Sequence, residues 1–170
     1  MQTHRHDLKA FVVVMAFFVL IGTGTKISGQ STKDKLPPGK WTFAAGPYFG
    51  SDYESVPVDV FSVTSDARKG LAVTSVVLQN RDTRNVVAVK LHWYLKDKDQ
   101  KGRVLLEGET PLIGVAVPAG ESQTLNYPVV SFAKVHKPLL KGTELSGNFR
   151  IEVAVSEVQY DDSSLWMKGK

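Results

Sequence analysis

The sequence predicts an all-β fold, an antiparallel β-sandwich of about 7–9 strands that follows an N-terminal hydrophobic helix. Three observations support this. Beyond residue 40, several windows alternate apolar and polar residues with period two. No comparable window repeats its apolar residues with the spacing of an amphipathic helix. Glycine, proline and aspartate also interrupt the alternating segments at short intervals, as turns between strands require.

The N-terminal segment has the layout of an export signal. Its apolar centre runs from Ala10 to Ile21 and follows a short polar head containing Arg5 and Lys9. This is short for a spanning helix, which needs about 20 apolar residues. We expect residues 1–29 to be a signal peptide, cleaved before Gln30, and the protein to be periplasmic or extracellular. The alternative is an uncleaved anchor through residues 10–25, with the domain outside the cytoplasm.

Residues 30–40, QSTKDKLPPGK, are polar and rich in proline, which predicts a flexible linker before a β-sandwich domain at residues 41–170. Residues 1–29 hold three of the 21 basic and one of the 17 acidic residues, so their removal lowers the net charge from +4 to +2. A balance this close to neutral argues against a nucleic-acid partner.

Two segments predict the central strands of the core. Between Asn85 and Asp97 every second residue is apolar, and residues 148–156 alternate in a similar way. Because side chains alternate across a strand, we expect one face to be buried and the other to be wet. The expected inward residues are Val87, Val89, Leu91, Trp93 and Leu95 in the first segment and Phe149, Ile151, Val153 and Val155 in the second. The expected outward residues are Lys90, His92, Tyr94 and Lys96, and then Arg150, Glu152 and Ser156.

The remaining strands are predicted from turn residues. Residues 71–80 change phase partway, which indicates a bulge near Thr74 or Ser75. The segment between Pro128 and Gly147 is expected to be a long connection, or a strand with a crossover. The weaker strands are Trp41 to Ala45, Val56 to Thr64, Arg103 to Glu107, Ile113 to Val117, Gln123 to Tyr127 and Leu165 to Met167.

An inward Trp93 in a long strand, preceded by a strand that ends in Leu78-Gln79-Asn80 and a turn, resembles the B and C strands of immunoglobulin-like or fibronectin type III-like domains. The pattern is also similar to small exported bacterial β-sandwiches, including FxLYD-type domains, although the motif that names the latter is absent. The resemblance implies an immunoglobulin-like sandwich. Such domains mostly bind, space or assemble, which does not by itself establish a function.

The residue types exclude much catalytic chemistry. The chain has no cysteine, which removes disulfides, thiolate metal sites and cysteine nucleophiles. Only His92 and His136 follow the signal, and none of the common hydrolase or nucleotide-binding motifs occurs. We therefore expect no catalytic residues, no metal site and no cofactor, and interpret His92 as a solvated surface histidine.

Acidic residues leave some chemistry open. Glu107 and Glu109 lie on the same face of their predicted strand. They would suit glycoside hydrolysis only if another acid faced them at the required separation between carboxyl groups. Residues 97–102 begin like a calcium loop but fit a hairpin turn better, because Lys101 replaces an oxygen ligand. The turn at residues 161–164 is a denser cluster of oxygen atoms that could assist a cation, but turns favour Asp and Ser for their own hydrogen bonds.

Lys90, His92, Tyr94 and Lys96 form the possible interaction surface, which could stack on a sugar or receive an acidic partner. The alternative is that they merely cover a sheet. Residues 47–53 contain three aromatics, which would form a recognition loop if exposed or close one end of the core if folded back.

The leading hypothesis is an exported, non-catalytic binding or accessory module of the cell envelope, with an unknown protein or glycan partner. One alternative is a small carbohydrate-active or ester-cleaving enzyme on a β-sandwich. The other is a membrane-tethered assembly subunit whose N-terminal helix is retained.

Overall fold

The computed structural model describes residues 41–53, 55–66, 70–136 and 146–169, so the predicted signal peptide (1–29) and linker (30–40) lie outside the described residues. The described part is mostly β, as predicted, with ten strands. They are β1 (Trp41–Pro47), β2 (Val58–Asp66), β3 (Leu71–Asn80), β4 (Val86–Asp97), β5 (Arg103–Glu109), β6 (Ile113–Val117), β7 (Ser122–Leu125), β8 (Val130–Ser131), β9 (Gly147–Tyr160) and β10 (Leu165–Met167). Two short helices, η1 (Ser51–Tyr53) and α1 (Phe132–His136), complete this part. Neither is long and apolar enough to span a membrane.

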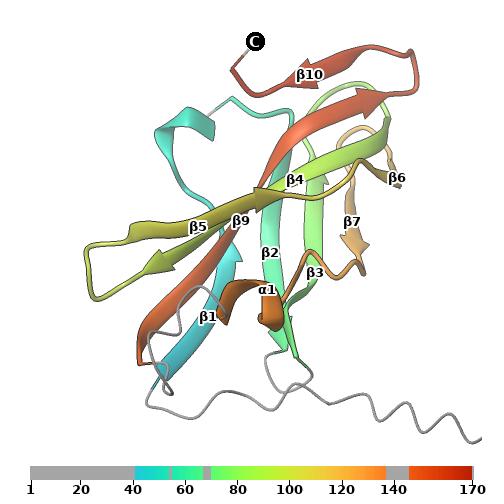
Figure 1. Cartoon of the computed structure of the whole chain (residues 1–170). Coiled ribbons are helices and arrows are strands. Elements are labelled where there is room, and N and C mark those ends of the chain that lie inside the picture. The colour runs from blue at the N-terminus through green and yellow to red at the C-terminus, as the bar shows by residue number, and fades with distance from the viewer. Residues whose placement is uncertain (1–40, 54, 67–69, 137–145, 170) are drawn as a thin grey trace, which may run out of the picture. The chain divides into compact units, whose positions relative to one another are not determined.

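The strands form two sheets that face each other (Figure 1). One has the order β1-β9-β4-β5, with β10 also paired to β9 and β6 also paired to β4. The other has the order β2-β3-β7, with β8 also paired to β3. The strand count exceeds the expected one because the segment after Pro128 contributes β8, which is too short to show alternation. Residues 137–145 of that connection lie outside the described residues.

The prediction of a purely antiparallel sandwich is wrong at one edge. β1 pairs with β9 in parallel, with Trp41 opposite Gly147 and Pro47 opposite Val153. β10 returns antiparallel along the same strand, from Leu165 opposite Gln159 to Met167 opposite Glu157. Local alternation predicts that a strand exists but carries no information about its partner or direction, which explains the error.

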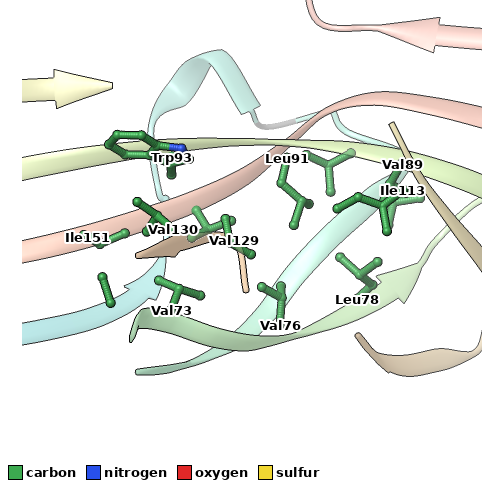
Figure 2. Close-up of a cluster of buried hydrophobic side chains, with 14 of the residues drawn as sticks. Val73, Val76, Leu78, Val89, Leu91, Trp93, Ile113, Val129, Val130 and Ile151 are labelled. Carbon is green, nitrogen blue, oxygen red and sulfur yellow. The ribbon is translucent and has the colours of Figure 1, made fainter. Parts of the chain in front are cut away.

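The core lies between the two sheets, and Figure 2 shows side chains of β3, β4 and β9 meeting there. Trp93 and Ile151, the two residues on which the predicted architecture depends, are 8% and 0% exposed. Trp93 has room because its partner across the strand pair is Gly108: a Cβ at that position would lie 2.6 Å from the indole Cζ2. The two predicted central strands therefore both bury the expected apolar face.

Bulges account for two errors in the predicted faces. Val87 was expected to point inward but is exposed, because the pairing of β4 skips it between Val86 and Ala88 and brings Val86 into the core instead. Ser156 was expected to be exposed but is buried, because the pairing of β9 with β4 skips it in the same way. A bulge adds one residue and reverses the parity beyond it, so alternation fails there.

One predicted bulge and one predicted hairpin turn are confirmed. The register between β2 and β3 jumps between Ser75 and Leu71, where the phase change indicated a bulge. Residues 97–102 form the turn of the β4–β5 hairpin, closed by the Gly102 N–H donating to the Asp97 carbonyl at 2.9 Å. Lys101 and Gly102 both have positive φ, which this turn requires.

A buried polar cluster holds the turn between β3 and β4. The Asn80 amide is 1% exposed and donates to the carbonyls of Arg84, Val117 and Pro118 at 2.8–3.1 Å. The Asp82 carboxylate accepts from Arg84 at 2.7 Å and from the Tyr160 hydroxyl at 2.9 Å. The hydrogen bond from Arg84 holds the pKa of Asp82 well below its usual range. These bonds join the two sheets at this end of the sandwich, so the cluster stabilises the packing of one sheet on the other.

Candidate functional site

The predicted interaction surface lies on the outer face of β4. Side chains of neighbouring strands and loops pair with its residues or cover them. We call Lys90, His92, Tyr94 and Lys96 the β4 stripe. The Lys90 ammonium lies 2.8 Å from the Glu157 carboxylate, and this hydrogen bond raises the pKa of the lysine. The Lys96 ammonium donates to Glu152 at 2.6 Å. Both lysines are therefore paired with acids of the adjacent strand β9.

His92 is not the solvated histidine expected from the sequence. Its side chain is 20% exposed and its ring stacks on Tyr94, with ring centroids 4.3 Å apart. Glu107 and Glu109 of β5 approach its two ring nitrogens, each at 3.5 Å. Within the described residues Nε2 has no hydrogen-bond partner. Alternation places His92 on the outer face correctly, but the acids across the strand pair shield it.

Tyr94 lies on the outer face, yet it is only 8% exposed, because the segment after β1 folds over it. The ring of Tyr48 stacks on the ring of Tyr94 with centroids 4.7 Å apart. The Tyr53 hydroxyl lies 3.3 Å from the Tyr94 hydroxyl. The aromatic loop at residues 47–53 therefore neither closes an end of the core nor stands free: two of its rings cover the β4 stripe.

Cations hold this loop against the sheet. The Lys96 ammonium lies 4.5 Å from the Tyr48 ring centroid, and the Lys168 ammonium lies 3.9 Å from the Tyr53 ring centroid. Each contact adds a cation–π attraction to the aromatic stack. Burial, together with the hydrogen bond to Tyr94, raises the pKa of Tyr53 well above its usual value. The raised pKa favours the neutral hydroxyl of Tyr53 in the folded chain.

The third aromatic residue of the loop belongs to a pocket at the edge of the sandwich. This edge pocket has a volume of about 380 Å³ and lies between the loop, the start of β2 and the middle of β9. Its apolar and aromatic walls combine with one acid and one base, as in many ligand sites. The lining residues are Tyr48, Phe49, Gly50, Ser51, Tyr53, Val56, Val58, Asp59, Val60, Arg81, Val153, Ala154 and Val155.

The polar part of the edge pocket is an ion pair. Arg81 pairs with Asp59 of β2, and the two side chains are 63% and 28% exposed. The Arg81 backbone N–H donates to the Pro57 carbonyl at 2.8 Å, which fixes the base of the side chain. Phe49, also in the lining, is 81% exposed. The pocket therefore offers a guanidinium, a carboxylate and an exposed ring to solvent.

The edge pocket lies at a gap in the strand pairing. On the edge of β9 away from β4, the pairing with β1 ends at Val153 and the pairing with β10 ends at Glu157. The Tyr48 N–H donates to the Val153 carbonyl at 2.9 Å, and the Lys168 N–H donates to the Ser156 carbonyl at 3.0 Å. Val155 lies between these two bonds and lines the pocket.

In the two turns that the sequence suggested as calcium sites, carboxylates accept hydrogen bonds from other groups of the chain. In the β4–β5 hairpin, the Asp99 carboxylate accepts two hydrogen bonds from Asn148. In the turn at residues 161–164, Ser164 hydrogen-bonds Asp162 and lowers the pKa of that carboxyl. Within the described ranges, no group of three or more His, Cys, Asp or Glu side chains is arranged to hold a metal ion. His136 ends α1.

Comparison with known proteins identifies no matching family model, no similar curated protein and no similar solved structure. The function is therefore inferred from the geometry of the chain itself. That geometry brings together the β4 stripe and two rings of the aromatic loop, as one closed surface. It also assembles a second site, the edge pocket, whose polar residues Asp59 and Arg81 carry no motif that sequence reasoning would notice. The three aromatics at residues 47–53 were the one signal in the sequence that pointed toward it.

Proposed function

We propose that the protein is an exported, non-catalytic binding module of the cell envelope, built as an immunoglobulin-like sandwich, which receives its ligand in the edge pocket. The strand order favours this fold. Reading β2-β3-β7 as strands A-B-E and β5-β4-β9-β10 as strands C′-C-F-G follows the strand order of immunoglobulin-like domains, and leaves β1, β6 and β8 outside the match. Trp93 then occupies the C strand, where such domains carry a buried tryptophan.

The observation that carries the binding proposal is the edge pocket itself, with Phe49 on it. A phenylalanine that is 81% exposed leaves a large apolar surface in water, and it does so at the one place where the wall of the pocket is also aromatic. A single exposed apolar side chain is common on protein surfaces, so what supports a contact site is that Phe49 lines a concave pocket together with other aromatic and apolar residues. Tyr48 and Tyr53, which also line the pocket, pack against each other, and Tyr48 stacks on Tyr94 of the β4 stripe.

A photo-crosslinking experiment tests the proposal. The photoreactive residue p-benzoyl-phenylalanine replaces Phe49 in the full chain, which is then irradiated in the cells that make it. The control places the same residue at Phe61, which is 70% exposed on a bulge of β2 but does not line the pocket. We expect a discrete adduct from position 49 and none from position 61. Equal labelling at both positions, or none at either, would contradict the proposal.

One observation favours a second candidate, a small carbohydrate-active or ester-cleaving enzyme: Glu107 and Glu109 converge on His92. These three residues are absent from the described lining of the edge pocket, in which Asp59 is the one acid and is already paired with Arg81. Hydrolysis of glycosides needs two acids on either side of one bond. Turnover of a chromogenic ester or glycoside that Glu107→Gln and Glu109→Gln both abolish would favour the enzyme.

The export part of the proposal is supported by residues 1–29 alone, which lie outside the described residues. N-terminal sequencing of the protein from the cell envelope tests it, and we expect a start near Gln30. Recovery of the intact N-terminus only after detergent extraction would favour a membrane-tethered assembly subunit held through residues 10–25.

A further inference from the structure

The walls of the edge pocket suit one large apolar side chain. Five valines and the rings of Tyr48, Phe49 and Tyr53 are among the residues that line it. The volume of about 380 Å³ is at the lower end of the range of about 300–1,000 Å³ for small-molecule sites. A single side chain with part of its backbone would fill such a space.

The mouth of the edge pocket suits a carboxylate. Among the described residues that line the pocket, Arg81 is the only base, and more than half of its side chain is exposed. A guanidinium presents several N–H donors in a planar fork and binds carboxylates with two parallel hydrogen bonds. Asp59 holds the arginine in place and at the same time competes with an incoming acid for it. Arg81 can exchange this partner, because an exposed ion pair contributes little to folding.

The floor of the edge pocket suits a peptide backbone. Val155 lies in the gap between the β1 and β10 pairings, with the Tyr48–Val153 and Lys168–Ser156 hydrogen bonds on either side of it. The gap is about one residue long at the usual rise of about 3.3 Å per residue, so it admits the end of a strand and not its middle. Addition of a backbone to a sheet edge is a recurring way of recognising peptides.

From these three features we infer that the edge pocket binds the carboxyl-terminal end of a peptide whose last side chain is large and apolar. The side chain enters the valine and aromatic walls, the terminal carboxylate displaces Asp59 from Arg81, and the last peptide unit lies along Val155. This inference depends on the proposed function and names the ligand class. The shared chemistry, an apolar body ending in a carboxylate, also occurs in small aromatic acids, so the experiment distinguishes the two.

The test measures the binding of three probes to the full chain by NMR titration. The probes are N-acetyl-Val-Phe with a free carboxylate, the same dipeptide as its C-terminal amide, and 3-phenylpropionate. We expect the free acid to bind at least about tenfold more tightly than the amide, because it gains charge-assisted hydrogen bonds. We expect 3-phenylpropionate to bind more weakly than the dipeptide acid, because it lacks the peptide unit.

Three variants assign the effect to the ion pair. Arg81→Gln should remove the preference for the acid over the amide. Asp59→Asn should tighten binding of the acid, because it removes the competing carboxylate. Arg103→Gln is the matched control, since Arg103 is an exposed arginine on β5 outside the pocket lining, and it should change nothing.

Each contrary outcome would overturn a named part of the inference. Equal affinities for acid and amide, or an Arg81→Gln variant that keeps the preference, would overturn the carboxylate. Affinity for 3-phenylpropionate equal to that for the dipeptide acid would overturn the peptide. Binding of none of the probes would overturn the inference as a whole. The crosslink at Phe49 tests the proposed function independently, because it needs no assumption about the ligand.

Discussion

The β4 stripe and the edge pocket are both built from polar and aromatic side chains, yet one is closed and the other is open. In the stripe each lysine has an acid of β9 beside it, and Tyr94 is covered by Tyr48. At the edge pocket the Arg81 side chain and Phe49 remain largely exposed. A row of polar residues along a strand thus becomes a site only if the neighbouring strands and loops do not satisfy it first. We therefore expect changes in the stripe to affect stability and changes in the pocket to affect binding.

The largest expected effect compares the two faces of β4 directly. Tyr94→Ala should lower the free energy of unfolding by about 3–5 kcal/mol, which is also the cost expected for Trp93→Ala. Both side chains are 8% exposed, and Tyr94 additionally carries two stacking contacts. Urea denaturation followed by circular dichroism measures both. A cost below about 0.5 kcal/mol for Tyr94→Ala, typical of a surface position, would show that the loop does not cover the stripe.

Removal of one shared acid should have a smaller effect. Glu152 accepts from Lys96 at 2.6 Å and lies 3.2 Å from the Arg150 guanidinium, and its side chain is 15% exposed. Glu152→Gln leaves two half-buried cations without a counter-charge, so we expect a loss of about 1–3 kcal/mol. The same denaturation experiment with Glu121→Gln, an exposed acid before β7, is the control and should show no significant change. Equal stability of both variants would mean that the stripe is solvated.

Alkaline pH should weaken the contact between the loop and the stripe. The pKa of Tyr53 is raised in the fold, so its contribution to stability is complete below the unfolded value of 10.0 and is lost as pH rises above it. Lys90 and Tyr160 also have raised pKa values and act in the same direction. We expect the free energy of unfolding to fall between about pH 10 and about pH 12, and to fall less steeply in Tyr53→Phe. Parallel pH profiles for the two proteins would contradict the role given to Tyr53.

The smallest effect on stability is expected at the pocket. Arg81→Gln removes an ion pair whose arginine is 63% exposed, so we expect a change of at most about 0.5 kcal/mol. The same variant should lose its preference for a carboxylate ligand. Thermal unfolding and probe titration on one sample would separate the two properties. A large loss of stability would mean that Arg81 is structural, as Arg84 is.

The inner side of the fold was predictable from the sequence because burial imposes a period. Alternation located β4 and β9 and placed Trp93 and Ile151 in the core, and turn residues gave the bounds of β3, β6 and β10. Prediction failed where one residue broke the period, at the bulges of Val87 and Ser156. It also failed for the parallel pairing of β1, which depends on contacts more than a hundred residues apart.

The candidate site was less predictable, for a physical reason. Alternation correctly gave the outer face to His92 and Tyr94 but could not reveal which groups cover that face, because Tyr48 and Glu107 come from other strands and loops. The edge pocket depends on the same kind of information, since Asp59, Arg81 and Val155 belong to three separate segments. Only the cluster of aromatics at residues 47–53 marked the region in advance.

One measurement tests the central claim, that ligands bind at the edge pocket and the β4 stripe is structural. The full chain carries p-benzoyl-phenylalanine either at Phe49 or at Glu107, which is the more exposed of the two acids beside His92, and is irradiated in the cells that make it. Our account predicts a discrete adduct from position 49 and none from position 107. An adduct from position 107 alone would place binding on the stripe and contradict the account.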